Sequence, residues 1–546
     1  MKNLFLTLIT LLIVNSCISQ NKNNFNNKRP KLVVGIVVDQ MRYDYLIKFY
    51  DKFGDDGFKK LINNGFNCEN VHLNYVPTHT AVGHTSIYTG TTPSIHGIIA
   101  NNWFDKKNNE MIYCVDDDNF KTIGGKKGGE KSPNRLNVTT ITDQLHLAQV
   151  NKGKVIGISL KDRAAILPVG YSANAAYWFK GKKEGNFISS SYYMNELPNW
   201  VKTFNKNKIA KTYLSQDWNT LYNINTYTES ILDDNDFEVN LKGENDVTFP
   251  HEISKIFKEK ENYSLIRKIP LGNTFLADFA KAAIIGESLG QHKETDFLSI
   301  SFSSTDYIGH TFGVDSKEVE DTYLRLDLDI ANFITFLDNK VGKENYTLFL
   351  TADHGALSPH PYLKSLKIPS ILFDRSLFEK YVDDLTLKYF NSANLVENIS
   401  NLQLFYNKKE LERLDLNHKE VSEKLIYDII NFEGIDKCVS AHTLQNTNFT
   451  EGILNYTQNG YNQKLSGDLI LIPTPNTVFY HKKGSGHSTG YSYDTHIPLL
   501  FYGYGINKGN NKNYIPVIDI APTISSLLKI EFPNGSTGKI IEKVLK

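Results

Sequence analysis

Six side chains that are able to bind a metal ion are spread over four segments of this chain. They are Asp39 in VVDQ, Asp306 and His310 in STDYIGH, Asp353 and His354 in TADHG, and His487 in GSGHSTG. Carboxylate oxygens and imidazole nitrogens suit zinc, and a catalytic zinc keeps one position open for substrate. Six ligands are too many for one catalytic zinc and enough for two. Two neighbouring metals can stabilise the attacking and leaving oxygens of an in-line displacement at phosphorus.

The stretch YVPTHTAVGHTSIYTG, residues 75–90, places several hydroxyl and imidazole side chains after the turn-forming Pro77. The segment that follows has the character of a helix, although threonine is a mediocre helix former. One interpretation is that a threonine hydroxyl caps the free N–H groups of the first helical turn. The other is that one of these hydroxyls is a nucleophile. The stretch by itself leaves both interpretations open.

The elements that must position these residues are short apolar runs that end in polar side chains. The runs are KLVVGIVVDQ, KVIGISLKDR, DFLSISFSSTDYIGH and NYTLFLTADHG. Near-continuous Val, Ile and Leu indicate strands that are buried on both faces, as in a parallel sheet. In open α/β sheets, functional sites lie beyond the carboxyl ends of the strands. We therefore predict an α/β fold in which these strands deliver the metal-binding residues, together with Lys161 and Arg163, to one edge of the sheet.

Helices are predicted between these strands. Apolar residues from Val319 to Leu337 recur at three- and four-residue steps, which indicates one apolar helix face. Shorter helices are predicted in GFKKLINNGF and VIDIAPTISSLLKI. Two stretches, at about 170–270 and 373–480, fit the alternation of strands and helices poorly. We interpret them as insertions that cover the site.

The chain begins with MKNLFLTLITLLIVNSC, which combines a basic start, an apolar run and small residues near Ser16. This layout predicts an export signal over residues 1–17 that is too short to span a membrane. Either Cys17 belongs to a loose lipobox and becomes a lipid-anchored N-terminus, or an ordinary signal is cleaved and Cys17 is lost. Residues 18–30 are polar and predicted to be a disordered tether. We expect a bacterial protein in the periplasm or anchored to the outer membrane.

The overall composition is that of a globular protein with an ordinary core. The chain has 546 residues, 40% of them hydrophobic, and 60 Lys and Arg balance 60 Asp and Glu. A nucleic-acid-binding protein usually shows a basic excess, so we expect no nucleic-acid partner. Cys68, Cys114 and Cys438 cannot all pair within one chain; export permits a disulfide between the first two, and three unpaired thiols are the alternative. The chain contains no Cys-x-x-Cys, which argues against a thiolate zinc site.

As an ordered set, several motifs resemble the alkaline phosphatase superfamily, and the PafA-type, phosphate-irrepressible alkaline phosphatases in particular. The motifs are VVDQMR, PTHTAVGHTSIYTG, NNW, LKDRAAILPVG, STDYIGHTFG, TADHGA and GSGHSTGYSYDTHIPLLFYG. The similarity runs from about Lys31 to the C-terminus, and the two insertions are its least diagnostic parts. It implies an α/β/α sandwich with a central, mainly parallel sheet over residues 31–546, and inserted cap segments.

The resemblance also implies a role for each matching residue. Thr80 falls at the position of the nucleophile. Asp39, Asp353 and His354 match the zinc site that also holds the nucleophile oxygen, and Asp306, His310 and His487 match the zinc site that faces the leaving group. Asn101, Lys161 and Arg163 match the groups that bind the non-bridging phosphoryl oxygens. The implied enzyme is a two-zinc phosphate monoesterase that works through a phosphothreonine on broad phosphomonoester substrates, and we expect it to be a monomer.

Several rival functions remain to be compared with this one. A neutral threonine hydroxyl is a poor nucleophile and needs activation by a metal or a base. Two cations, Lys161 and Arg163, two positions apart and therefore on one side of an extended segment, favour a dianionic monoester over a monoanionic diester. The rivals are a phosphodiesterase or nucleotide pyrophosphatase with the same ligands, and an inactive binding protein. A sulfatase is disfavoured because the chain has no Cys-x-Pro-x-Arg.

Overall fold

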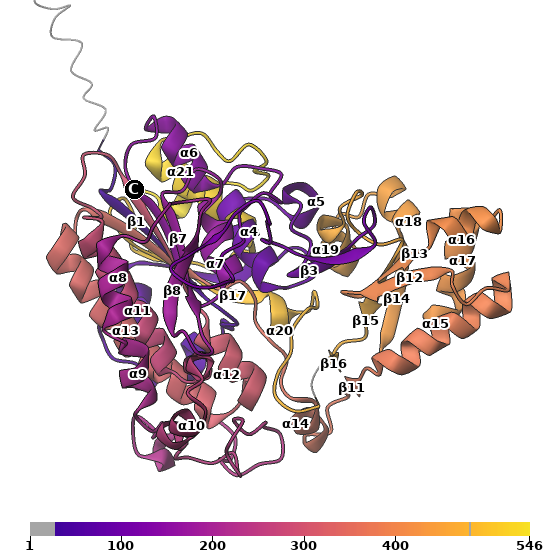
Figure 1. The fold of residues 1–546 in the computed structure, drawn as a ribbon, viewed down its shortest axis with the longest axis horizontal. Helices are drawn as coiled ribbons and strands as arrows, with labels where there is room; N and C mark the ends of the chain where they lie inside the picture. Colours follow the sequence, from indigo (N-terminus) through magenta and orange to yellow (C-terminus); the bar gives the residue numbers. More distant parts are fainter. Residues whose placement is uncertain (1–27, 480–481) are drawn as a thin grey trace, which may run out of the picture.

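The computed structural model describes residues 28–479 and 482–546 (Figure 1). The predicted export signal with Cys17, and residues 18–27 of the predicted tether, lie outside the described residues. The boundaries of the expected domain and insertions stay predictions.

The described chain is built around a large sheet whose centre is parallel. The sheet has 11 strands, and its main path runs β18-β2-β17-β10-β1-β9-β6-β7-β8-β5. The strands are β18 (Gly509–Asn511), β2 (Phe66–His72), β17 (His496–Gly503), β10 (Tyr346–Thr351), β1 (Leu32–Val38), β9 (Asp296–Phe302), β6 (Val155–Ser159), β7 (Ala175–Lys180), β8 (Asn186–Ser190), β5 (Thr122–Ile123) and β19 (Ile515–Pro516), which pairs with β2. The strands from β10 to β7 are mutually parallel, whereas β17 and β8 are antiparallel to their neighbours.

The four strands predicted from sequence lie side by side in the order β10, β1, β9, β6. Every residue of the four is buried, as their continuous apolar sequences predict. Their registers align the carboxyl ends, because Val37 pairs with Thr351 on one side and Val38 pairs with Phe302 on the other. The polar residues that follow the strands therefore emerge at one edge.

Helices cover both faces of the sheet, which confirms the α/β/α sandwich (Figure 1). One layer contains α11 (Leu271–Gly286) and α13 (Lys317–Leu337), which pack against each other. The other contains α4 (Thr80–Thr89), α6 (Ile141–Ala148) and α21 (Ile520–Leu528). The predicted long helix is α13, which begins after the N-cap Ser316, and the predicted short helices are α3 (Phe58–Asn64) and α21.

Of the residues between about 170 and 270, some belong to the central sheet and the rest lie outside it. Residues 175–190 hold β7 and β8, which extend the central sheet. The sequence of β7, AAYWFK, is buried through aromatic rather than β-branched side chains, so it lacks the composition that marks the other strands. The rest of this stretch forms α8 (Asn199–Lys206), α9 (Ile209–Leu214), α10 (Ile253–Lys260) and irregular chain.

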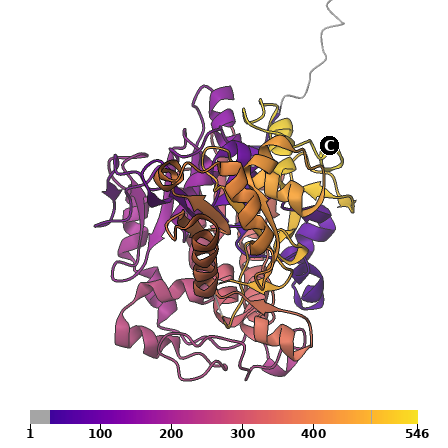
Figure 2. The ribbon, with the colours of Figure 1, turned by 90° about the vertical axis from the view of Figure 1, so that its right-hand side faces the viewer.

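The residues from 371 to 478 form a cap beside the main sheet, and Figure 2 looks onto it. Its own sheet has the order β12-β13-β15-β14, with β12 (Val396–Ser400), β13 (Gln403–Tyr406), β15 (Leu469–Pro473) and β14 (Ile435–Ser440). Its helices are α15 (Arg375–Phe390), α16 (Lys408–Arg413), α17 (His418–Ile429), α18 (Ala441–Asn446) and α19 (Gly452–Gly460). Phe378, Leu404 and Leu425 belong to a hydrophobic core that is separate from the main core.

Two further expectations concern the cysteines and the membrane. Cys68, Cys114 and Cys438 are buried and unpaired. Of the two alternatives, a disulfide between the first two or three unpaired thiols, this structure has the second. Within residues 28–479 and 482–546, no helix combines the length and the apolar character needed to cross a membrane.

Candidate active site

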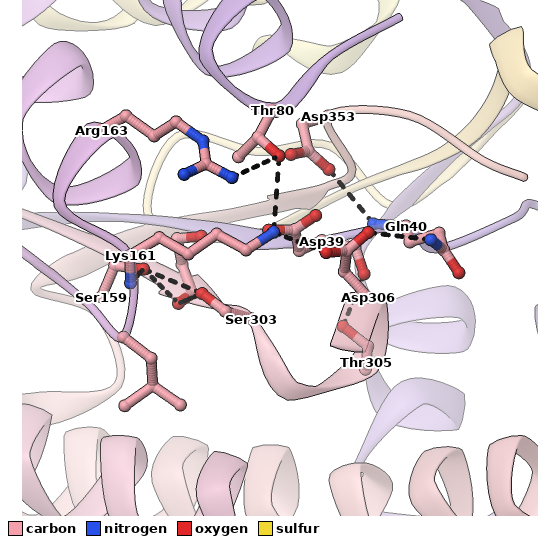
Figure 3. Close-up of polar contacts among 12 residues, drawn as sticks. Asp39, Gln40, Thr80, Ser159, Lys161, Arg163, Ser303, Thr305, Asp306 and Asp353 are labelled. Atoms are coloured by element: carbon pink, nitrogen blue, oxygen red, sulfur yellow. Dashed lines mark hydrogen bonds and ion pairs between the residues drawn. The ribbon is translucent and has the colours of Figure 1, made fainter. Parts of the chain in front are cut away.

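The predicted site residues meet at the carboxyl edge of the central strands. Asp39 follows β1, and Asp353 and His354 follow β10. Asp306 and His310 lie in α12 (Ser304–Phe312), directly after β9, and Lys161 and Arg163 lie at the start of α7 (Asp162–Ile166), after β6. Thr80 is the first residue of α4, and His487 lies in the loop before α20 (Ser492–Thr495). Figure 3 shows how Thr80, Lys161, Arg163 and three of the carboxylates face one another.

The first group of potential metal ligands consists of Asp39, Asp353 and His354. One ligand atom from each lies within 4.8 Å of the others, and all three side chains are fully buried. Asp39 Oδ1 and His354 Nε2 have no hydrogen-bond partner in the described chain, and the neighbour of Asp353 Oδ2 is His84 Nδ1 at 3.2 Å. Buried polar atoms without partners are costly, and two carboxylate oxygens with one imidazole nitrogen are a donor set that zinc accepts. These residues therefore fit a metal ion.

The second group consists of Asp306, His310 and His487, whose ligand atoms also lie within 4.8 Å of one another. Asp306 Oδ1 is 3.1 Å from His310 Nε2 and 3.8 Å from His487 Nε2. The rings of His354 and His487 stack with their centroids 3.6 Å apart, so the two groups are adjacent. These are the same two groups that the family resemblance implies.

The three histidines share one orientation that suits metal binding. The Nδ1 atom of each lies beside a backbone carbonyl oxygen: Ser485 O at 2.7 Å from His310, Gly355 O at 3.0 Å from His354, and Thr78 O at 2.6 Å from His487. A carbonyl only accepts, so Nδ1 carries a proton, and Nε2 is the ring nitrogen that faces the carboxylates. An outer partner on the second nitrogen is a common feature of metal-binding histidines.

The electrostatics of the two groups reflect burial and the opposite charges packed around them. Burial lowers the pKa of His354, and burial together with the neighbouring His354 and His310 lowers the pKa of His487 well below its usual value. These shifts favour the neutral imidazole, which is the state that binds a metal. Burial, with the charge of Asp353, raises the pKa of the Asp39 carboxyl. Although burial opposes the shift, His354 and His84 lower the pKa of Asp353 to about 2.

Thr80 lies between these groups and two cations. Its Oγ1 is 3.4 Å from Lys161 Nζ and 3.5 Å from Arg163 Nη2 (Figure 3). Lys161 Nζ also donates to Asp39 Oδ2 and to Asp306 Oδ2, each at 2.6 Å, and so connects both ligand groups. Because Thr80 begins α4, the positive end of the helix dipole lies near its hydroxyl. The N-cap of this helix is His79, whose side chain makes no capping hydrogen bond.

The other threonine hydroxyls of the 75–90 stretch donate to backbone carbonyls. Thr85 Oγ1 donates to Ala81 O and Thr89 Oγ1 donates to Thr85 O, both within α4, while Thr78 Oγ1 donates to Thr489 O. None of the three caps the first turn of α4. The structure therefore leaves Thr80 as the hydroxyl of this stretch that faces the ligand groups.

Lys161 and Arg163 both reach Thr80, but not from one extended segment. Lys161 has extended backbone angles and is the N-cap of α7, whereas Arg163 is already inside this helix. The expectation that alternation along a strand places them on one side is therefore wrong, because the chain turns between them. Hydrogen bonds orient the Arg163 side chain toward Thr80. Arg163 Nη1 donates to Tyr113 Oη at 3.0 Å, and Tyr113 Oη donates to Asp162 Oδ1.

Asn101 reaches the site through the first turn of α4. Its Oδ1 accepts a hydrogen bond of 2.9 Å from the backbone N–H of Ala81, the residue after Thr80. This contact holds the carboxamide beside the nucleophile candidate. It leaves the Nδ2 amide of Asn101 as a hydrogen-bond donor beside Thr80.

Sequence reasoning missed two residues that support the site. Gln40 donates from Nε2 to Asp306 Oδ1 at 2.8 Å and from its backbone N to Asp353 Oδ1 at 3.2 Å, and it has a left-handed φ of 67°. Its position directly after Asp39 was a signal that could have found it. Tyr113 carried no such signal, because it is 50 positions from Arg163 in sequence.

The geometry can be compared with known proteins. The family model described as type I phosphodiesterase / nucleotide pyrophosphatase matches residues 33–497. Alkaline phosphatase PafA of Elizabethkingia meningoseptica is 43% identical over 542 residues, covering 98% of both chains. The chain belongs to the PafA-type alkaline phosphatase family. This confirms the resemblance drawn from the sequence motifs.

Other relatives and a solved structure agree with this placement. Alkaline phosphatase PhoV of Synechococcus elongatus is 45% identical and covers 95% of this chain and 93% of its own. A Myroides odoratus protein named calcium-transporting ATPase is 46% identical and covers 95% of both chains. The crystal structure of wild-type PafA matches with a TM-score of 0.92 at 44% identity, covering 95% of this chain and 99% of that one. The shared fold of the PafA-type alkaline phosphatases thus extends over nearly the whole chain.

Proposed function

We propose that this alkaline phosphatase hydrolyses phosphate monoesters of small molecules through a covalent phosphothreonine on Thr80. The observation that carries the proposal is the position of the Thr80 hydroxyl, within 3.5 Å of two cations and beside both ligand groups. In the first displacement, the Thr80 Oγ–phosphorus bond forms as the ester bond to phosphorus breaks, and the leaving group departs as an alcohol with the proton that the Thr80 hydroxyl gives up. In the second, the oxygen of water bonds to phosphorus, the Thr80 Oγ–phosphorus bond breaks, and Thr80 regains a proton as inorganic phosphate leaves.

We propose that two zinc ions are the cofactors, one at each ligand group. Asp39, Asp353 and His354 would hold the first, and Asp306, His310 and His487 the second. Zinc bound there supplies positive charge that stabilises the attacking and leaving oxygens. The partnerless buried atoms of the first group and the shared histidine orientation of both groups support this assignment.

The residues of the chain account for the preference for monoesters. Lys161 and Arg163 place two positive charges close to Thr80 Oγ1. When phosphorus is bonded to that oxygen, its non-bridging oxygens must lie beside these charges. A monoester dianion offers three non-bridging oxygens with two charges, whereas a diester offers a single charge. Phosphoryl transfer depends mainly on positioning and charge stabilisation. A solved variant of PafA carries substitutions of a threonine, an asparagine, a lysine and an arginine, the same residue types as Thr80, Asn101, Lys161 and Arg163.

The alternative is a phosphodiesterase, which the description of the matching family model favours. Rates for an aryl phosphate monoester and for the corresponding methyl aryl diester separate the two functions. We expect a higher kcat/KM for the monoester, with activity lost in a chelator and recovered on adding zinc. A higher kcat/KM for the diester would contradict the proposal.

We also propose that the protein is exported, by way of the signal predicted over residues 1–17, and that it acts as a monomer. Support for export comes from the sequence of that segment alone. Whether Cys17 carries a lipid is decided by mass spectrometry of the mature N-terminus.

A further inference from the structure

A basic cavity of about 320 Å³ lies beside the catalytic site, at the carboxyl ends of β6 and β7. Lys161 and Arg163 line it, so one wall of the cavity is also part of the site around Thr80. Tyr307, whose ring centroid is 5.1 Å from Lys161 Nζ, lines it as well. A volume above about 300 Å³ is within the range of pockets that bind small molecules.

The lining of the cavity carries an excess of positive charge. Its cationic residues are Lys131, Lys161, Arg163, Lys180, Lys182 and Arg267. Among the described residues, Asp162 is the only acidic residue of the lining, and Lys131 pairs with it at 3.2 Å. Lys161 is compensated by Asp39 and Asp306.

Four cations of the lining therefore have no carboxylate partner. They are Arg163, Lys180, Lys182 and Arg267, and the described chain contains no ion pair for any of them. Like charges that line one cavity without a carboxylate partner repel one another. An anionic ligand would relieve this repulsion.

Arg267 is held rigidly in the wall. Its Nη2 donates to the carbonyl oxygens of Leu160 at 3.1 Å and Phe179 at 2.6 Å, the ends of β6 and β7. Its guanidinium carbon is 5.8 Å from the centroid of the Phe179 ring, and its buried Nε has no hydrogen-bond partner in the described chain. A guanidinium fixed in this way loses little entropy when it binds phosphate oxygens.

We propose that this cavity binds a second phosphate group of the substrate, so that small molecules with two phosphate monoesters are preferred over those with one. The inference rests on the proposed phosphomonoesterase function. One phosphate lies against Thr80, Lys161 and Arg163, and the other against Lys180, Lys182 and Arg267. Arg163 stands between the two phosphate positions and faces both.

The test uses linear alkanediols of increasing length, each as the monophosphate and as the bisphosphate. For each length, kcat/KM of the bisphosphate is divided by two, for its two equivalent groups, and compared with that of the monophosphate. At the length that spans both positions, we expect the bisphosphate to be favoured by at least about tenfold, since hydrogen bonds to charged groups contribute on that order. A ratio near one at every length would overturn the proposal.

Adjacent lysines provide a matched control. Lys182 and Lys183 are both exposed, but only Lys182 lines the cavity, and each substitution by alanine removes one charge from the same turn. Lys182→Ala, alone and with Lys180→Ala, is expected to move the bisphosphate ratio toward one, whereas Lys183→Ala should preserve it. Equal losses in Lys182→Ala and Lys183→Ala would indicate long-range attraction only and would refute the second phosphate position. If neither substrate of any pair is hydrolysed by the wild-type protein, the proposed monoesterase function itself is wrong.

Discussion

Thr80 is distinguished from the threonines near it by what surrounds its hydroxyl. Thr85 and Thr89 donate to carbonyls of their own helix, whereas Thr80 Oγ1 lies near Lys161, Arg163 and the buried carboxylates. The sequence left its role open between a cap and a nucleophile. Thr80 does not act as the cap, because the N-cap residue is His79 and the first-turn N–H of Ala81 donates to Asn101 Oδ1.

Thr80→Ala should lower kcat for an aryl phosphate monoester by several orders of magnitude, because loss of the nucleophile removes the covalent route. Bound metal, measured by elemental analysis, should stay close to the wild-type content. Thr80→Ser keeps a hydroxyl at this position and serves as the control, with activity well above that of the alanine variant. Unchanged activity in Thr80→Ala would rule out the assignment.

Lys161→Ala and Arg163→Ala should each reduce monoester kcat/KM by about 10- to 100-fold, the effect of losing a hydrogen bond to a charged group. The kcat/KM for a methyl aryl diester should fall much less, because a diester carries one negative charge. The measurement is the ratio of the two values in each variant. An equal loss on both substrates would show that these cations do not select the dianion.

How much of the site could be predicted depends on where each residue lies in the sequence. Asp39, Asp306 and Asp353 were found because each follows a recognisable buried strand. Tyr113, which orients Arg163, does not follow such a strand, and only the fold brings it into contact with Arg163. The turn between Lys161 and Arg163 was missed because a helix as short as α7 has no periodicity to read.

At the scale of elements, the approach of α4 to the end of β10 determines where Thr80 lies relative to Asp353. Gly83, one turn after Thr80, permits this approach. A Cβ atom added at Gly83 would lie only 2.6 Å from the Cβ of Asp353.

Gly83→Ala should therefore move α4 away from Asp353 and lower both stability and activity. Overpacking of this kind costs about 1–3 kcal/mol in the free energy of unfolding. Gly54→Ala is the matched control, because the nearest atom to its added Cβ is Asp327 Oδ2 at 3.5 Å. Chemical denaturation and monoester kcat/KM measure the two effects, and an unchanged free energy of unfolding in Gly83→Ala would contradict the account of this packing.

Helix α13 contains a buried carboxyl that should make stability depend on pH. Burial raises the pKa of Asp329 to about 7, although the hydrogen bond that Thr274 Oγ1 donates to its side chain at 3.0 Å opposes the rise. In the unfolded chain this pKa is about 3.9. Between these values the folded state binds more protons, so the free energy of unfolding contributed by Asp329 falls as pH rises from about 4 to 7.

Asp329→Asn removes this titration. The free energy of unfolding, measured in urea from pH 5 to pH 8, should fall less steeply with pH for the variant than for the wild type below pH 7. Above pH 7 the two curves should be parallel. Identical pH dependence in the two proteins would show that Asp329 is not protonated in the fold.

At the scale of the whole molecule, the sequence predicted the parallel centre of the sheet and its long helix, because buried strands and amphipathic helices have strong local patterns. It did not predict the antiparallel strands β17 and β8 or the four-stranded sheet of the cap. Their pairing is decided by contacts between residues far apart in sequence. In the cap sheet, for example, Gln403 of β13 pairs with Ile470 of β15.

The central claim, a covalent intermediate on Thr80, is tested most directly by the stereochemical course at phosphorus. A monoester made chiral with oxygen isotopes is allowed to transfer its phosphoryl group to an added alcohol. Each in-line displacement inverts the configuration, so two successive displacements through Thr80 predict net retention. Net inversion would mean that the acceptor attacks the substrate directly and would contradict the account.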